Sequence, residues 1–225
     1  MESWTVARMR RHYRLLAMHR PSAALDYLSA TGDVQAVRAE QGPEPEAIVE
    51  RCRQGEMRAW RELFEEHGPY LRRLLGRIGV DTADLDDALQ DTFVVAHKKL
   101  GGFDGRSRIR TWLTGIALRV ASQNRRRAMA RRLGRVWMDA PSPSPAPTPE
   151  DLAEISRGRP VLREILAGIG ERKRSVFVLY EVEGMEGDEI ARTLGCSVNT
   201  VWSRLRHARA EFARAIARRR AKERR

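Results

Sequence analysis

The stretch from Glu186 to Phe212, EGDEIARTLGCSVNTVWSRLRHARAEF, constrains the fold more than any other part of the chain. Its apolar residues recur at steps of three and four, the period of a helix with one buried face, and Gly195 interrupts the pattern. Two helices joined by so short a turn must cross at a steep angle. Gly195 can adopt the positive φ that such a turn needs, and Ser197 is a suitable N-cap for the second helix. We therefore predict a helix-turn-helix.

The second of these helices carries polar and cationic side chains on its outer face and flanks. Hydrogen-bonding and basic groups of this kind fit the major groove of DNA. A plain helical hairpin with a solvated basic face is the alternative interpretation. The candidate DNA contacts are Ser197, Asn199, Thr200, Trp202, Ser203, Arg204, Arg206, His207 and Arg209. Within this set, Trp202 can also pack on an adjacent helix, and Arg209 suits a phosphate contact better than a base contact.

The formal net charge of the 225 residues is +12, which points to a polyanionic partner. Nucleic acid and anionic membrane both fit this charge, but no run of 18 apolar residues exists and no apolar leader follows the N-terminus. We therefore expect a cytoplasmic protein with no membrane partner. The two cysteines are Cys52 and Cys196, and their separation argues against a disulfide framework or a zinc site. We expect no cofactor and no metal.

Helical patterns also dominate the first half of the chain from Ile48 onward. One helix follows, with an interruption predicted at Gly68-Pro69. The residues of its apolar stripe recur at steps of three and four and are Trp60, Leu63, Phe64, His67, Leu71, Leu74 and Leu75. A second helix begins near Asp84. Leu85, Ala88, Leu89, Phe93 and Ala96 form the apolar stripe of that second helix. Its opposite side carries the acidic set Asp86, Asp87, Gln90 and Asp91, which is a solvated face or a dock for a basic partner. A metal–carboxylate site is a third and less favoured alternative, because helical aspartates without a substrate pocket rarely form one.

A third helix is predicted from Ile109, after a basic loop that contains glycine. No acidic residue occurs between Asp104 and Asp139, although the chain has 30 of them, so this region suits contact with phosphates. Phe103 and Trp112 are aromatics that can stack on a base, and Trp112 fits the core equally well. The candidate residues here are Phe103, Arg106, Arg108, Arg110, Trp112, Arg119, Arg125 and Arg126.

Residues 139–150 read DAPSPSPAPTPE, and alternating proline forbids helices and sheet ladders, which leaves an extended spacer. Because no strand-like alternation occurs elsewhere, the fold class is all-α with two small helical domains. We expect an N-terminal extension at 1–43, a first domain at 44–136, a linker at 137–155, a second domain at 156–217 and a basic tail at 218–225. The extension, with a basic amphipathic stretch from Trp4 to Leu16, is assigned no function. A basic amphipathic helix can touch a membrane, but a solvated segment, or one that precedes the start codon used in the cell, is the favoured interpretation.

The order of these parts resembles the sigma-70 family of bacterial RNA polymerase, in the extracytoplasmic-function (ECF) group, whose members consist of region 2 and region 4. Asp86–Phe93 resembles the region 2.2 motif, and Trp112-Leu113 with Ile116-Ala117 resembles the motif that follows it. In region 4 the similar segments are Glu183-Gly184, Glu189-Ile190-Ala191, Leu194-Gly195 and Thr200–Leu205. The resemblance covers about residues 47–216.

The resemblance implies that this chain binds core RNA polymerase and directs promoter-specific transcription initiation, without enzymatic activity. It implies that the acidic set docks on the β′ clamp helices, that region 4 meets the β flap, and that promoter DNA is bound at two places. The residues from Phe103 to Arg126 would meet the −10 element and help to melt it, and the residues from Ser197 to Arg209 would read the −35 element. An anti-sigma factor is a further partner that the resemblance implies, although no residue identifies one.

Four positions depart from the family pattern. Arg119 stands where Asn is usual, Gln123 where Asp is common, His97 where an aromatic is common, and Ile169-Gly170 replaces Leu-Pro. A helix accommodates all four. Arg119 lies where the family touches the promoter, so it bears on the preferred −10 sequence and not on the class of protein.

Two other classes of function are compatible with a basic helix-turn-helix chain. A repressor or activator that acts without polymerase needs a ligand pocket, a receiver domain or a dimer helix, and residues 47–127 show none of these patterns. A nucleic-acid enzyme needs a convergent cluster of carboxylates or histidines, whereas the five histidines are scattered.

Overall fold

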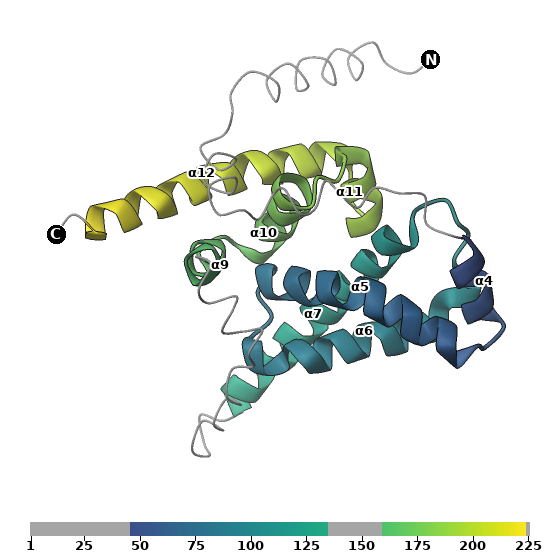
Figure 1. The fold of residues 1–225 in the computed structure, drawn as a ribbon. Coiled ribbons are helices and arrows are strands. Elements are labelled where there is room, and N and C mark those ends of the chain that lie inside the picture. Colours follow the sequence, from purple (N-terminus) through teal and green to yellow (C-terminus); the bar gives the residue numbers. More distant parts are fainter. Residues whose placement is uncertain (1–45, 135–158, 224–225) are drawn as a thin grey trace, which may run out of the picture.

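The computed structural model describes residues 46–134 and 159–223, and every regular element in these ranges is helical (Figure 1). The all-α prediction is therefore confirmed for them, whereas the predicted extension and the whole of the predicted linker lie outside the described residues. None of the described helices is long and apolar enough to cross a membrane. In chain order the elements are α4 Glu46–Arg53, α5 Met57–Arg77, η1 Thr82–Asp84, α6 Leu85–Lys99, η2 Leu100–Gly102, α7 Ile109–Gly134, α9 Arg159–Ala167, α10 Glu171–Phe177, η4 Val178–Val182, α11 Gly187–Leu194 and α12 Val198–Glu223.

Helices α5, α6 and α7 form the first core. Leu63, Leu71, Leu74 and Leu75 of α5 are fully buried, and they recur at the spacing that places them on one side of the helix. The interruption predicted at Gly68-Pro69 is wrong, because α5 runs through Pro69. Proline removes one backbone hydrogen bond from a helix, and the burial of the residues that follow it offsets this loss.

The second core lies in α10, η4, α11 and α12. The rings of Phe177 and Phe212 stack at 4.8 Å, and Val201 is fully buried at the start of α12. The predicted turn is confirmed: Gly195 has φ +62°, and the Ser197 hydroxyl accepts a hydrogen bond from the Thr200 amide at 3.2 Å. Helix α12 continues to Glu223, so part of the predicted basic tail extends this helix (Figure 1).

The two cores contact each other through polar groups on α5, α7, η4 and α11. The Arg77 guanidinium lies 3.0 Å from the Glu183 carboxylate, and the two side chains are 12% and 1% exposed. Burial raises the pKa of Glu183 above its ordinary value, although Arg77 acts in the opposite direction. The Thr111 hydroxyl donates to Glu189 at 2.7 Å. The first contact holds the end of η4 against α5, and the second holds α11 against α7.

We expect Arg77→Ala to lower the free energy of unfolding by about 3–5 kcal/mol, because it leaves the Glu183 carboxylate buried without its cation. Urea denaturation followed by circular dichroism measures this change. Replacing both partners, as Arg77→Ala with Glu183→Leu, should recover most of the loss, since no charge is then buried. An unchanged free energy in the single variant would show that Glu183 is solvated in solution.

Candidate nucleic-acid and partner interfaces

The acidic set of α6 lies on the surface as predicted from the sequence. Asp86, Asp87, Gln90 and Asp91 are all exposed, within the first two turns of the helix. Asp86 accepts a hydrogen bond from the Arg72 side chain at 3.0 Å, and no described residue pairs with Asp87 or Asp91. The set therefore presents carboxylates that a basic partner can reach.

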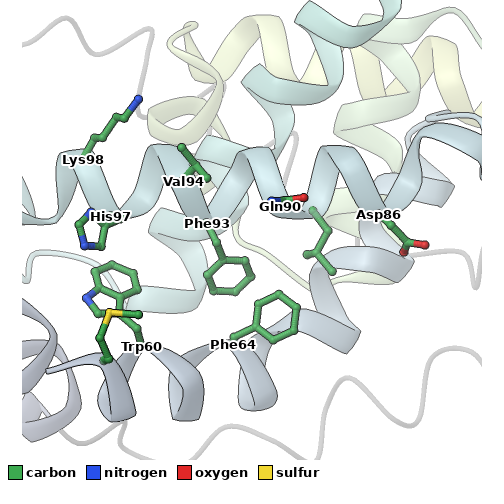
Figure 2. Close-up of a pocket in the computed structure, with 10 residues that line it drawn as sticks. Trp60, Phe64, Asp86, Gln90, Phe93, Val94, His97 and Lys98 are labelled. Atoms are coloured by element: carbon green, nitrogen blue, oxygen red, sulfur yellow. The ribbon is translucent and has the colours of Figure 1, made fainter.

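An apolar groove of about 630 Å³ runs beside these carboxylates, between α5 and α6. Figure 2 shows Trp60 and Phe64 of α5 facing Phe93 and His97 of α6 across it. The ring centroids of Phe64 and Phe93 lie 4.8 Å apart, and those of Trp60 and His97 lie 5.0 Å apart. His97 thus occupies the position of the family's common aromatic with a ring of its own.

The groove gathers the exposed apolar surface of the described chain. Its exposed large hydrophobic residues are Met57, Phe64 and Val94, at 74%, 43% and 44% exposure, and all three line this one groove. Periodicity placed Phe64 on a buried stripe and gave no role to Met57 or Val94. The predicted apolar stripe is present in α5, but Phe64, which belongs to it, is partly exposed to solvent. Contiguous exposed apolar surface is typical of sites that bind a protein, a membrane or a ligand.

The residues predicted to meet the −10 element divide into an exposed and an engaged group. Arg106, Arg108, Arg119 and Arg126 are exposed around α7 and the loop before it. Phe103 is only 8% exposed, with its ring 5.3 Å from that of the half-buried Trp112. Hydrophobic burial thus holds the Phe103 ring in the core of this structure, and its stacking on a base stays a prediction that would require the ring to move.

Two further arginines of this group already contact protein groups. The guanidinium of Arg110 lies 3.8 Å above the centre of the Tyr70 ring. Arg125 donates to the Ile78 carbonyl at 2.8 Å and pairs with Glu171 across the domain contact. Burial alone would raise the pKa of Glu171, but the hydrogen bond and the charge of Arg125, together with Ser122 and Arg174, outweigh burial, and the pKa is lowered.

The residues predicted to read DNA from α12 are mostly open to solvent. Asn199, Ser203, Arg206 and His207 are exposed, and Thr200 and Arg204 are half-buried. Ser197 caps the helix, as its hydroxyl bonds to the Thr200 amide. The first turns of α12 thus present amide, hydroxyl, imidazole and guanidinium groups together, which is the chemistry that reads base edges.

Two of these residues contact other protein groups. Trp202 lies against Gly187 of α11, and its ring is 5.5 Å from that of Tyr180, so it packs on the adjacent helix, as one interpretation expected. Arg209 donates to the buried Glu181 carboxylate at 2.6 Å. Arg209 therefore has a structural role, because removing it would leave a buried charge alone, and its phosphate contact stays a prediction.

Nothing in the described ranges resembles a metal site, since no three His, Cys, Asp or Glu side chains converge there. Cys52 is buried and Cys196 is half-buried, and both are free thiols.

Two family models match the two cores of this chain. The model for sigma-70 region 2 matches residues 63–131, and the model for sigma-70, region 4, matches residues 160–212. The chain is 31% identical over 170 residues to RNA polymerase sigma factor NccH of Alcaligenes xylosoxydans xylosoxydans. The matched stretch covers 74% of this chain and 91% of that protein. It is 30% identical over 173 residues to the ECF RNA polymerase sigma-E factor of Escherichia coli (strain K12), covering 73% and 90% respectively.

Solved structures give the same result at the level of the fold. The structure of CnrH in complex with the cytosolic domain of CnrY superposes with a TM-score of 0.55 at 28% identity, covering 76% of this chain and 96% of that one. The chain belongs to the sigma-70 family. Within that family it is an ECF sigma factor, a protein that directs transcription initiation and is not an enzyme.

We expect Gly187→Ala to destabilise the second domain by about 1–3 kcal/mol, because a Cβ atom there would lie 2.6 Å from the Trp202 ring. Urea unfolding measures this change. Gly101→Ala serves as the matched control, since its Cβ would meet nothing within 4 Å, and it should change the free energy by less than about 0.5 kcal/mol. Equal stability of the two variants would mean that Trp202 does not pack on α11.

Proposed function

We propose that this sigma factor binds core RNA polymerase through the α5–α6 face of region 2 and grips the promoter through α7 and α12. The observation that carries the proposal is the meeting of an exposed apolar groove with unpaired Asp87 and Asp91 on one face of the first domain. Neither a repressor nor a nuclease requires such a face. Its place of action would be the cytoplasm, where core polymerase works.

The docking face combines two physical contributions. The groove offers apolar area, whose burial supplies most of the affinity, at about 25 cal/mol per Å². The carboxylates of α6 add attraction to a basic partner, which raises the association rate and fixes the orientation. Paired helices with a basic, partly apolar surface, such as the β′ clamp helices, fit this combination. Polymerase is also named in the description of the relatives.

Promoter opening at the −10 element would use the arginines of α7 and its preceding loop. Arg106, Arg108, Arg119 and Arg126 are exposed and can follow the phosphates of an unpaired strand. Arg125 would have to exchange Glu171 for a phosphate, so DNA and the domain contact compete for it. Binding energy from polymerase and promoter would drive melting, with no ATP.

Recognition of the −35 element would fall to the first turns of α12. Asn199, Thr200 and Ser203 can bond base edges, while Arg204, Arg206 and His207 contact bases or phosphates. A second, smaller groove between α9 and α12, lined by Ile165, Gly168 and Ala215 with basic residues at its rim, would receive the β flap.

An anti-sigma factor is the remaining proposed partner. The solved structure of CnrH contains the cytosolic domain of CnrY, and that of RpoE contains the anti-sigma factor NepR from Bartonella quintana. A protein that inhibits this sigma factor would gain most by covering the α5–α6 face.

We expect Asp87→Arg with Asp91→Arg to abolish binding to core polymerase, because both exposed carboxylates become repulsive toward a basic partner. A pull-down with purified core polymerase measures binding, and circular dichroism should show an unchanged helical content. The control pair Glu186→Arg with Asp188→Arg makes the same charge change at two exposed sites of the second domain and should bind normally. Normal binding by the Asp87/Asp91 variant would refute the docking assignment.

We expect Arg204→Ala to weaken binding to a −35 duplex more than to random DNA, by about 1–3 kcal/mol, if its guanidinium contacts a base. Fluorescence anisotropy on both duplexes at two salt concentrations measures the difference. Arg220→Ala is the control, as it lies 16 residues further along α12, or roughly 24 Å. Equal losses on the two duplexes would reduce Arg204 to a phosphate contact.

A further inference from the structure

The groove between α5 and α6 is large enough for a short amphipathic helix. Its lining extends along α6 from Asp86 to Lys98, a rise of about 18 Å at 1.5 Å per residue. Its walls are apolar in the middle, and Asp86 and Lys98 lie at opposite ends (Figure 2). An isolated protein that exposes Met57, Phe64 and Val94 together gains by covering them with its own chain.

Residues 1–25 contain a segment of matching size and pattern. Val6, Met9, Tyr13 and Leu16 recur at steps of three, four and three, so an α-helix would place them on one side. The 11 residues from Val6 to Leu16 would span roughly 16 Å as a helix, close to the length of the groove. Trp4 and Leu15 would fall on the opposite side of that helix.

The charges of the segment and the groove are complementary. Residues 1–25 contain five arginines and one acidic residue, Glu2. The groove is bordered by Asp86, with the exposed Asp87 and Asp91 on the same helix, against the single lysine Lys98. Arginines flanking an apolar stripe can therefore pair with carboxylates that have no described partner.

The connection between segment and groove is short. Helix α4 begins at Glu46 and leads directly to α5, whose first residue, Met57, lines the groove. The Trp60 indole donates to the Cys52 carbonyl at 3.2 Å, which fixes α4 next to the groove wall. The 29 residues from 17 to 45 would reach roughly 30 Å as a flexible chain. A tether of this length gives a local concentration near the millimolar range, so weak intrinsic affinity suffices.

We propose that residues 6–16 bind in cis to the groove between α5 and α6 and cover Met57, Phe64 and Val94 in the free sigma factor. One consequence rests on the proposed function: the segment and core polymerase compete for the same face. The N-terminal segment is then a built-in competitor that keeps the free protein soluble and sets a threshold for polymerase binding.

Photo-crosslinking of the full chain tests the docking without polymerase. Tyr13 is replaced by p-benzoylphenylalanine, and an equal mixture of isotopically light and heavy chains separates crosslinks within a chain from those between chains. We expect crosslinks within one chain to peptides that contain Met57, Phe64 or Val94. The same probe at Leu15, on the opposite side of the segment, should give at least tenfold less, and Val94→Asp should reduce the Tyr13 crosslink similarly.

Three outcomes would overturn the proposal. They are crosslinks to other parts of the chain, crosslinks only between chains, and an unchanged yield in the Val94→Asp variant. Transfer of the probe to anionic lipid vesicles, with loss of the groove crosslink when they are added, would also overturn it and assign the segment to membranes. Because polymerase is absent, none of these results depends on the proposed function.

Competition with polymerase is measured separately. Met9→Ser with Leu16→Ser removes two residues of the stripe and should raise the affinity of the full chain for core polymerase about three- to tenfold. Trp4→Ser with Leu15→Ser removes as many apolar residues from the other side and should leave it unchanged. If no variant bound polymerase at all, the proposed function would fail, while the crosslinking result would still decide the docking.

Discussion

The arrangement of the two domains depends on one buried charge. Glu183 lies in the second domain with its side chain 1% exposed, and the cation that neutralises it, Arg77, belongs to the first. A carboxylate taken out of water without a partner costs several kcal/mol, so the second domain favours contact with the first. One Glu183 oxygen has no hydrogen-bond partner, which shows that the compensation is incomplete. The contact is therefore specific in geometry but modest in strength.

The contact between the two domains decides which basic side chains of α7 are exposed. Thr111 and Arg125 of α7 contact Glu189 and Glu171 of the second domain, whereas Arg119 and Arg126 of the same helix remain exposed. In the proposed function the exposed arginines attract DNA first, since unscreened charge governs encounter. The engaged Arg125 becomes available only when Glu171 is displaced. In the proposed function, contact between the domains and contact with the promoter are therefore alternatives for this one side chain.

Local chemistry made part of this structure predictable from the sequence. Gly195 and Ser197 act within their own turn, so the turn and the cap followed from residue type alone. Long-range contacts did not follow. Periodicity assigned Phe64 to a buried stripe, but it does not tell which neighbour covers the stripe. Arg209 was interpreted as a phosphate contact because its partner, Glu181, lies 28 residues away, and Arg77 and Glu183 are 106 residues apart.

On the face between α5 and α6, apolar side chains would supply affinity and carboxylates would supply orientation. This combination suits more than one occupant. Its aromatic floor, in which the rings of His97 and Trp60 meet at a tilt, offers non-directional apolar contact that any amphipathic helix can use. The carboxylates at one end attract a basic partner through their charge. Salt screens this attraction, with a screening length of about 10 Å at 0.1 M ionic strength. Any occupant with an apolar stripe and flanking basic residues can use both the apolar contact and the charge. Polymerase, an anti-sigma factor and the chain's own N-terminal segment would then differ in the apolar area that they bury and in whether they are tethered to the face. A tethered segment needs little area, because its local concentration is already high. An untethered partner must bury a larger apolar area of the groove to displace the segment. Only a partner with a sufficiently large apolar surface would then occupy this face.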